Sequence, residues 1–495
     1  MAAPEAVAHE PRAVDNRSAN QGELLRVPLG YPGRPKALGR KFLVHQIGAR
    51  RLAAPHAAPM KSLLLLSFLL LCPATPSAQD ANWPAWRGAS GNGVAPAANP
   101  PVNWSETENI AWKVALPGHG KSTPIVYGER IFLLAALPTE ASTEAQRSAL
   151  PVFENQLTRA PEEWMAFLVL ALDRRSGELL WETEVTRRLQ PSGVHETNGY
   201  ASFSPVCDGE RLYASFGSNG VYALDVEHGK VQWSYELGPQ RTRKGWGEAG
   251  SPAIAGELLL VVADQEDDSW IHALELKSGK PRWKRARDEP STWTVPLVLE
   301  VDGQLQAVVN GTQAVRAYDV QSGEVLWSCP GQTTNAIPSP VSDGKLVVCT
   351  SGYRGSACMA LDLRQRDPKD PSKPRIAWQQ SEGTPYVPSP VLSDGRLYLL
   401  GKNSGRLSCI ELASGERLID RERLDLGNVY ASPLIAGGRI YVVDRDGKTV
   451  VLQHRERLEV LAVNQLEEPI DASPVALGEV LYLRSESSLY AIGKP

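Results

Sequence analysis

The sequence has no excess of positive charge, because 52 lysines and arginines stand against 56 aspartates and glutamates, a formal net charge of −4. This balance argues against a surface that binds the phosphate backbone, so we expect no nucleic-acid partner. The longest apolar runs are also well short of the roughly 20 residues that cross a bilayer. We therefore predict no transmembrane segment.

Histidine and cysteine are scarce, at 8 and 6 of the 495 residues. The motifs HExxH, CxxC and CxxCH are absent, so no sequence signal indicates a zinc site or a covalently bound c-type haem. GxSxG is absent as well, which leaves no nucleophile elbow of the hydrolase type. Cys349 and Cys358 flank an expected hairpin, and two interpretations stay open: a disulfide between them, or two buried free thiols.

The N-terminal part of the chain differs from the rest in composition. Residues 1–59 carry scattered Ala and Pro without a hydrophobic period, and we interpret them as a disordered extension from a misassigned start. Residues 60–78 have the positive start, short apolar run and small-residue end of a signal peptide. Residues 79–108 form an N-terminal lead. The mature protein is therefore expected to be exported, to the periplasm or the extracellular space.

Ser-Pro and related proline dipeptides recur along the rest of the chain. From Pro205 to Pro474 there are six intervals over 269 residues, a mean near 45, which is typical of four-stranded propeller blades. Each unit repeats a tight turn, apolar strands and a Ser-Gly or His-Gly turn in the same order. We predict an all-β fold, an eight-bladed β-propeller of four-stranded antiparallel blades over residues 109–495. The eight anchors are Pro124, Pro205, Pro252, Pro296, Pro340, Pro390, Pro433 and Pro474.

The two ends of the repeat region predict how the ring closes. The last unit lacks an outer strand, whereas an outer-strand sequence around Trp112 stands before the first anchor. We predict that this N-terminal strand completes the last blade, because a closed ring has no exposed sheet edge. The first unit is longer than the others, and the excess maps to an insertion over 138–163 whose composition favours a short helix.

A tryptophan stands four residues after the turn glycine in most units. A single sheet cannot bury its own faces, and an indole on the outer strand can cover the next blade and donate its N–H to backbone there. We interpret these side chains as structural docking groups rather than as parts of a cofactor site. The docking set comprises Trp112, Trp181, Trp233, Trp283, Trp327 and Trp378.

The segments just before the Ser-Pro anchors lead into the innermost strands, so they should ring one mouth of the central channel. Aromatic residues recur there at nearly matched positions, with polar residues between them. This combination suits a ligand or peptide site, although rings that merely plug the channel would give the same pattern. The candidate ligand-binding residues are Tyr200, Trp246, Glu248, Trp293, Asn335, Tyr386, Tyr430 and Asp471. We assign no catalytic and no metal-ligating residue.

The unit with Ala171-Leu172-Asp173, then Ser176-Gly177, then Trp181 resembles the repeat of pyrroloquinoline-quinone (PQQ) propellers. The opening WPAWRGASGNG at residues 83–93 is similar to that of secreted PQQ-like repeat proteins from planctomycete-type bacteria. The resemblance implies the propeller fold. It also implies two branches of function, one enzymatic with PQQ and Ca²⁺, and one non-enzymatic that includes BamB-like outer-membrane assembly scaffolds.

This sequence departs from the enzymatic branch in one visible respect. That branch carries adjacent cysteines, a calcium held by Glu and Asn, and a catalytic Asp. No Cys-Cys occurs here, and no residue of this sequence can be assigned as the counterpart of that Glu, Asn or Asp. We therefore favour a secreted, non-catalytic propeller with a protein or small-molecule ligand at one face. The alternative is a PQQ-dependent dehydrogenase of an alcohol or sugar.

Overall fold

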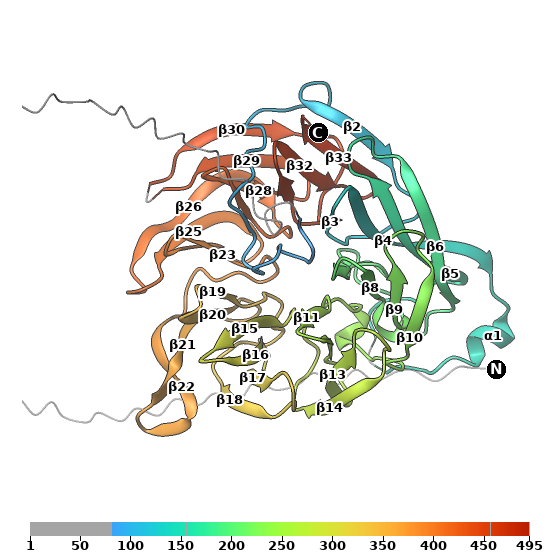
Figure 1. Cartoon of the computed structure of the whole chain (residues 1–495), viewed down its shortest axis with the longest axis horizontal. Coiled ribbons are helices and arrows are strands. Elements are labelled where there is room, and N and C mark those ends of the chain that lie inside the picture. Colours follow the sequence, from blue (N-terminus) through green and yellow to red (C-terminus); the bar gives the residue numbers. More distant parts are fainter. Residues whose placement is uncertain (1–81, 155, 456, 495) are drawn as a thin grey trace, which may run out of the picture. The chain divides into compact units, whose positions relative to one another are not determined.

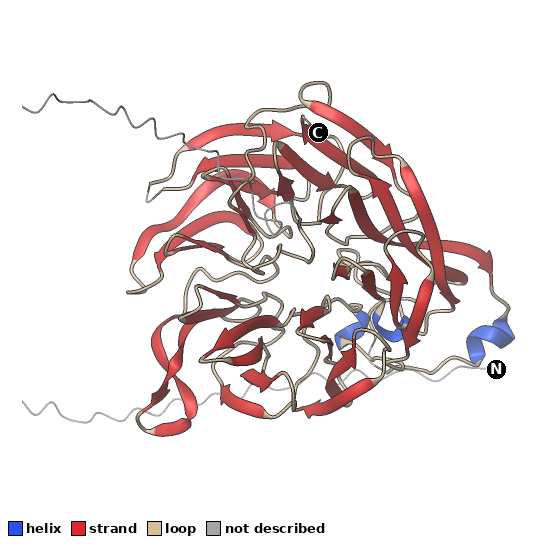
Figure 2. Ribbon diagram, viewed as in Figure 1, coloured by secondary structure: helices blue, strands red, loops and turns tan. Residues whose placement is uncertain are grey.

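The computed structural model describes residues 82–494 apart from 155 and 456, so the interpretations of 1–59 and 60–78 lie outside the described residues. The described chain forms eight sheets that follow one another around a central axis (Figures 1 and 2). Each has four antiparallel strands, and one sheet gains a fifth strand that is parallel. The predicted all-β, eight-bladed propeller is confirmed. Blades are numbered 1 to 8 in the order of their proline anchors.

Blades 1 to 4 each take four consecutive strands, with the innermost strand first. Blade 1 contains β3 (Ile125–Tyr127), β4 (Arg130–Ala141), β5 (Glu163–Asp173) and β6 (Leu179–Arg188). Blade 2 contains β7 (Val206–Cys207), β8 (Arg211–Ser215), β9 (Val221–Asp225) and β10 (Val231–Tyr235). Blade 3 contains β11 (Ala253–Ala255), β12 (Leu258–Ala263), β13 (Ser269–Glu275) and β14 (Pro281–Arg287). Blade 4 contains β15 (Leu297–Val301), β16 (Gln304–Val309), β17 (Val315–Asp319) and β18 (Val325–Cys329).

Blades 5 to 8 repeat this order, and the N-terminal part of the chain supplies one strand to blade 7 and one to blade 8. Blade 5 contains β19 (Val341–Ser342), β20 (Leu346–Ser351), β21 (Ala357–Asp367) and β22 (Asp370–Gln380). Blade 6 contains β23 (Val391–Ser393), β24 (Arg396–Leu400), β25 (Ser404–Glu411) and β26 (Arg417–Asn428). Blade 7 contains β27 (Leu434–Ala436), β28 (Arg439–Val443), β29 (Lys448–Gln453), β30 (Val460–Gln465) and the added β1 (Val94–Ala95). Blade 8 contains β31 (Val475–Leu477), β32 (Val480–Arg484), β33 (Ser488–Gly493) and β2 (Ile110–Ala115).

The ring closes in blade 8, where the N-terminal strand β2 pairs antiparallel with the C-terminal strand β33. Trp112 lies opposite Ala491 in this register, and Val114 lies opposite Leu489. The predicted closure by a strand near Trp112 is therefore confirmed. An ion pair of 2.9 Å between Lys113 of β2 and Glu468 of the β30–β31 loop holds the same junction from outside.

Five of the six docking tryptophans meet the turn glycine of the following blade. A Cβ added to Gly279 of blade 3 would lie 2.6 Å from Cδ2 of Trp233 of blade 2, so only glycine lets the indole approach this closely. The Trp233 Nε1–H donates to the carbonyl of Leu276, three residues before that glycine, at 2.9 Å. The same donation occurs from Trp181 to Val226, Trp283 to Val320 and Trp378 to Leu412.

Two junctions differ, for local reasons. Trp112 covers Gly177 of blade 1, but its buried Nε1 has no hydrogen-bond partner among the described residues. Trp327 is 2% exposed and faces blade 5, where the turn between β21 and β22 is lengthened and has no glycine at the usual place. Trp327 therefore packs into an apolar cluster with Cys349 and Leu361, and its Nε1 also lacks a partner there.

The insertion of blade 1 lies between β4 and β5, whose pairing continues outward to Ala141 and Glu163. It contains α1 (Glu144–Ser148), which Thr143 and Gln146 begin with a capping box. Two short 3₁₀ segments, η1 (Gly217–Asn219) and η2 (Arg243–Gly245), lie in other loops. The described part of the chain holds no helix with the length and apolarity needed to cross a membrane.

The disulfide alternative for Cys349 and Cys358 is wrong in this structure. None of the five cysteines of the described residues forms a disulfide, and all five are buried. In the β20–β21 register, Cys349 lies opposite Met359 and Cys358 lies opposite Thr350, so the two side chains point to opposite faces of the sheet. Cys349 packs between blades 4 and 5, and Cys358 packs between blades 5 and 6.

Replacement of Trp233 by alanine is expected to lower the free energy of unfolding by about 3–5 kcal/mol, because it leaves a cavity over Gly279 and removes the stronger of the two donors to the Leu276 carbonyl, which keeps only the Tyr213 hydroxyl at 3.3 Å. Chemical denaturation followed by circular dichroism measures the change. Val325→Ala, at an outer-strand side chain that is 52% exposed, serves as the control and should change the stability little. A Trp233→Ala protein as stable as the parent would contradict the docking interpretation.

The closing junction should make stability depend on acid pH through Glu468. Burial opposes the charged form of this carboxylate, but hydrogen bonds from Ser485, Ser487 and Lys113 outweigh burial and lower the pKa of Glu468 from 4.5 to about 2. A carboxylate with a lowered pKa stabilises the fold above its unfolded pKa, and this contribution disappears as the pH falls from about 4.5 towards 2.

We therefore expect Glu468→Gln to destabilise the protein at pH 7 by about 1–2 kcal/mol, with screening by solvent taken into account. The difference between variant and parent should shrink as the pH falls towards 2. Urea unfolding at pH 7, 5, 3 and 2 measures it. The exposed Glu486 of the β32–β33 turn gives the matched control, since Glu486→Gln should leave the pH profile unchanged.

Candidate functional site

Near the channel axis, neighbouring blades are joined by a hydrogen bond from a backbone N–H of one blade to the side-chain hydroxyl of the residue that precedes the anchor proline of the next blade. The Ser204 N–H donates to Ser251 Oγ at 2.8 Å, and the Ser389 N–H donates to Ser432 Oγ at 2.9 Å. The same bond joins seven of the eight junctions, and we call this ring the hydroxyl belt. Its hydroxyl groups belong to Thr123, Ser204, Ser251, Ser339, Ser389, Ser432 and Ser473.

The belt has one gap, between blades 3 and 4. Blade 4 carries Val295 where the other blades carry serine or threonine, so the Ser251 N–H finds no hydroxyl there. The Val295 N–H itself donates normally to Ser339 Oγ at 2.8 Å. The gap therefore comes from one side chain and not from a change in the path of the backbone.

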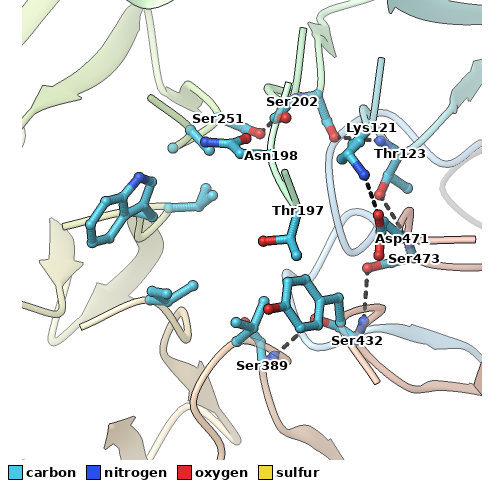
Figure 3. Close-up of a pocket in the computed structure, with 18 of the residues that line it drawn as sticks. Lys121, Thr123, Thr197, Asn198, Ser202, Ser251, Ser389, Ser432, Asp471 and Ser473 are labelled. Carbon is cyan, nitrogen blue, oxygen red and sulfur yellow. Dashed lines mark hydrogen bonds and ion pairs between the residues drawn. The ribbon is translucent and has the colours of Figure 1, made fainter. Parts of the chain in front are cut away.

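A cavity of about 390 Å³ lies inside the belt and opens towards the segments that precede the innermost strands. Its walls come from all eight blades. Figure 3 shows belt residues around the space, with Lys121, Thr123, Asp471 and Ser473 together on one side. The opposite wall, from blades 4 and 5, is apolar and aromatic and contains Trp293, Val295, Ile337 and Tyr353.

Five of the eight candidate residues line this cavity. They are Trp246, Trp293, Tyr386, Tyr430 and Asp471. All five side chains are half-buried, so the rings neither fill the channel completely nor lie open on the surface. The Trp246 and Trp293 rings are 6.4 Å apart at 35°. Burial raises the pKa of Tyr386 to about 12, so this phenol stays neutral at ordinary pH.

The other three candidates do not line the cavity. Tyr200 turns away and donates its hydroxyl to the Ser192 carbonyl at 2.9 Å. Glu248 accepts the Ser218 N–H at 2.7 Å, and burial raises the pKa of Glu248 to about 7. Asn335 is 1% exposed, lies behind the mouth and adopts a left-handed φ of 59°.

Sequence reasoning missed four residues that the structure places in the cavity wall: Trp86, Lys121, His195 and Tyr353. Tyr353 lies in the β20–β21 turn, and its ring stacks on Tyr386 at 5.0 Å and 29°. It meets Trp246 edge-on at 86°. Trp86, His195 and Tyr353 stand away from the repeated aromatic position, so the period carries no signal for them. Lys121 stands three residues before its anchor, as Trp293 and Tyr430 do, but it is not aromatic.

Trp86 comes from the N-terminal lead, which crosses the end of the channel beyond the cavity. Trp83 forms a bridge with Val126 of blade 1, and β1 pairs parallel with β27 of blade 7. The buried Arg87 donates to the carbonyls of Pro390 at 2.5 Å and Pro433 at 3.3 Å. The lead thus fastens the innermost strands of several blades and places Trp86 in the cavity wall.

The charged side chains of the cavity lie together on one side. Asp471 is the one carboxylate in its wall, and it pairs with both Lys121 and Arg445, the latter at 2.7 Å. Arg445 also lies 4.9 Å from the centre of the Tyr430 ring. Glu196 also acts electrostatically on Arg445, so two carboxylates balance the two cations on this side of the cavity.

The mouth segments are joined blade to blade, which fixes the aromatic side chains. The Asn198 Nδ2–H donates to the Trp246 carbonyl at 2.8 Å, and the Trp293 Nε1–H donates to the Gly247 carbonyl at 2.8 Å. The insertion of blade 1 supports the same region, because Thr158 donates its hydroxyl to the Gly245 carbonyl at 2.7 Å. The cavity is therefore largely pre-formed, as small-ligand sites commonly are.

Comparison with known proteins gives one family and a shared fold. The profile of the family described as "Outer membrane protein assembly factor BamB" matches residues 166–420 and 369–492. A curated relative of that name from Yersinia pestis is 25% identical over 294 residues, 57% of this chain and 68% of the relative.

Two solved structures share the fold at low sequence identity. BamB from Moraxella catarrhalis aligns with a TM-score of 0.50 at 14% identity, over 72% of this chain and 100% of that one. Quinohemoprotein alcohol dehydrogenase from Comamonas testosteroni aligns with a TM-score of 0.56 at 11% identity, over 84% of this chain and 81% of that one. At these identities the likeness establishes the propeller architecture alone.

The gap in the hydroxyl belt predicts opposite effects of two substitutions. Val295→Thr should stabilise the protein by about 0.5–1.5 kcal/mol, because it gives the Ser251 N–H an acceptor. Ser389→Ala should cost about 1–3 kcal/mol, because it leaves the buried Ser339 N–H unpaired. Urea denaturation measures both, and Val295→Ala controls for the loss of the valine methyl groups. A destabilised Val295→Thr would contradict the role given to the belt.

Proposed function

This chain belongs to the family of outer membrane protein assembly factor BamB, and on that premise we propose that it is an exported, non-catalytic β-propeller that binds a ligand or partner at one mouth of its channel. The cavity inside the hydroxyl belt carries the proposal. It has a size typical of ligand sites, aromatic side chains from several blades, and a few polar groups that converge on one space.

The binding residues in this proposal are those that both the repeat pattern and the cavity wall include: Trp246, Trp293, Tyr386, Tyr430 and Asp471. Trp86, Lys121 and Tyr353 join them from outside the repeat. Aromatic groups held by a rigid frame bind with little loss of conformational entropy, which suits recognition rather than a mobile catalytic site.

The second candidate is a PQQ-dependent dehydrogenase, because a quinohemoprotein alcohol dehydrogenase has a similar fold. That activity needs a calcium ion beside the quinone, and Ca²⁺ takes about six to eight oxygen ligands. Asp471 is the one carboxylate of the cavity wall and is already shared by Lys121 and Arg445. Within residues 82–494 no group of three or more His, Cys, Asp or Glu side chains is placed to hold a metal. The residues present do not fit a calcium-bound quinone, and we favour binding without catalysis.

The two candidates differ in a direct assay. Incubated with PQQ and excess Ca²⁺, the protein should not reduce a redox dye with ethanol, polyvinyl alcohol or glucose, while an authentic quinohemoprotein alcohol dehydrogenase does so in parallel. Ca²⁺ alone should leave the Tm unchanged. Dye reduction above the blank would overturn the non-catalytic assignment.

Binding at the mouth is tested separately, with a library of small aromatic and polar fragments observed by ligand-detected NMR. Fragments should bind the parent protein, and the double variant Trp246→Ser/Tyr430→Ser should lose most of them while it keeps the parent's circular dichroism spectrum. Leu180→Ser, on the exposed outer strand β6, is the control and should keep the binding. Fragments that bind parent and double variant alike would place the site elsewhere.

A further inference from the structure

The hydroxyl groups of the belt have unused protons that face the cavity. Six of the seven belt hydroxyls line it, and each belongs to a residue that is at most 8% exposed. Each oxygen accepts an N–H from the neighbouring blade, and within the described chain none of these six hydroxyls donates to a protein acceptor. A buried hydroxyl proton needs an acceptor, so the cavity offers a partial ring of O–H donors. The six are Thr123, Ser204, Ser251, Ser389, Ser432 and Ser473.

Two cations without carboxylate partners lie beside the aromatic residues of this cavity, although the whole chain is acidic. Lys244 Nζ lies 6.0 Å from the centre of the Trp246 ring, and the Arg354 guanidinium lies 5.4 Å from that of Tyr353. Neither cation has an ion-pair partner among the described residues. Asp471 and Glu196 balance Lys121 and Arg445, so it is these two unpaired cations that favour a ligand with negative charge.

The aromatic wall presents ring faces at several inclinations. Trp246 is tilted by 35° to Trp293 and by 86° to Tyr353. Such a wall covers the apolar C–H faces of a puckered ring, and removal of those faces from water is favourable. The apolar side lies at blades 4 and 5, whereas Lys121 and Asp471 lie at blades 1 and 8, so a ligand with one apolar face and one charged edge has a defined orientation.

We propose that this cavity binds an acidic saccharide, a pyranose ring that bears a carboxylate or a sulfate. Its C–H face packs on Trp246 and Trp293, its ring and hydroxyl oxygens accept protons from the belt, and its own hydroxyls donate to Asp471. Its anionic group lies towards Lys244, the unpaired cation beside Trp246. This inference rests on the proposed function and names the ligand class of that site.

Isothermal titration calorimetry with defined oligosaccharides tests the class. Trigalacturonate and a sulfated trisaccharide are compared with a neutral trisaccharide of the same length. We expect at least one of the acidic sugars to bind ten times more tightly than the neutral one, with an affinity that falls as salt rises. Equal binding of acidic and neutral sugars would overturn the proposal.

Two matched variants separate charge at the mouth from charge in general. Lys244→Gln should weaken binding of the acidic sugar about tenfold and leave any neutral sugar unchanged. Lys284→Gln removes a similar cation from an aromatic ring, 3.9 Å from Trp270 on the outer strands of blade 3, and should change nothing. Equal losses in the two variants would show a non-specific charge effect and contradict the site.

The result also separates this inference from the proposed function. If no sugar binds but fragments bind and are lost in Trp246→Ser/Tyr430→Ser, the cavity is a ligand site and the saccharide class is wrong. If PQQ binds there more tightly than every sugar and Lys244→Gln weakens it, the anion is a planar quinone acid and the saccharide class is again wrong. If nothing binds the cavity, both proposals fail.

Discussion

The contact between neighbouring blades is the constraint on which the molecule depends, since a four-stranded sheet cannot bury both of its faces alone. Every junction has at least one of two such contacts, which lie at different radii, and several junctions have both. Near the axis a hydroxyl accepts the N–H of the preceding blade, as Ser432 does from Ser389, and near the rim an indole lies on a glycine of the next blade, as Trp233 does on Gly279. Two fastenings fix both the distance and the rotation between blades. The loops at the mouth inherit that geometry, which is why side chains from eight blades converge on one cavity.

This constraint also explains why the fold could be predicted from the sequence. The same junction has to form around the ring, so Ser-Pro and Gly-Trp recur and can be counted, and the isolated Trp112 strand predicts closure. The repeat alone could not reveal that the Gly of a unit contacts the Trp of the preceding blade, whereas the Trp of that unit contacts the Gly of the following blade. It also could not show whether Cys349 forms a disulfide with Cys358, because the direction of the two side chains depends on the β20–β21 register.

The candidate site was predictable only where it follows the repeat. Trp246, Trp293, Tyr386 and Tyr430 stand at matched places before the anchors, and all four line the cavity. Glu248 belongs to the same segment as Trp246, but its carboxylate turns towards Ser218 and accepts the backbone N–H of that residue. Lys121 and Trp86 were missed for a different reason. Lys121 stands where other units carry an aromatic residue but is not aromatic itself, and Trp86 comes from a lead that precedes the repeat.

The belt joins the scaffold to the site, because one hydroxyl serves both. Its oxygen holds the next blade and its proton faces the cavity, so loss of a belt serine removes a structural acceptor and a ligand donor together. Val295 has neither group, and it lies beside Trp293 in the apolar wall opposite Lys121 and Asp471. The single interruption of the belt therefore gives an otherwise nearly symmetric channel an apolar side and a polar side. That asymmetry lets a ring of similar blades bind a ligand in one orientation.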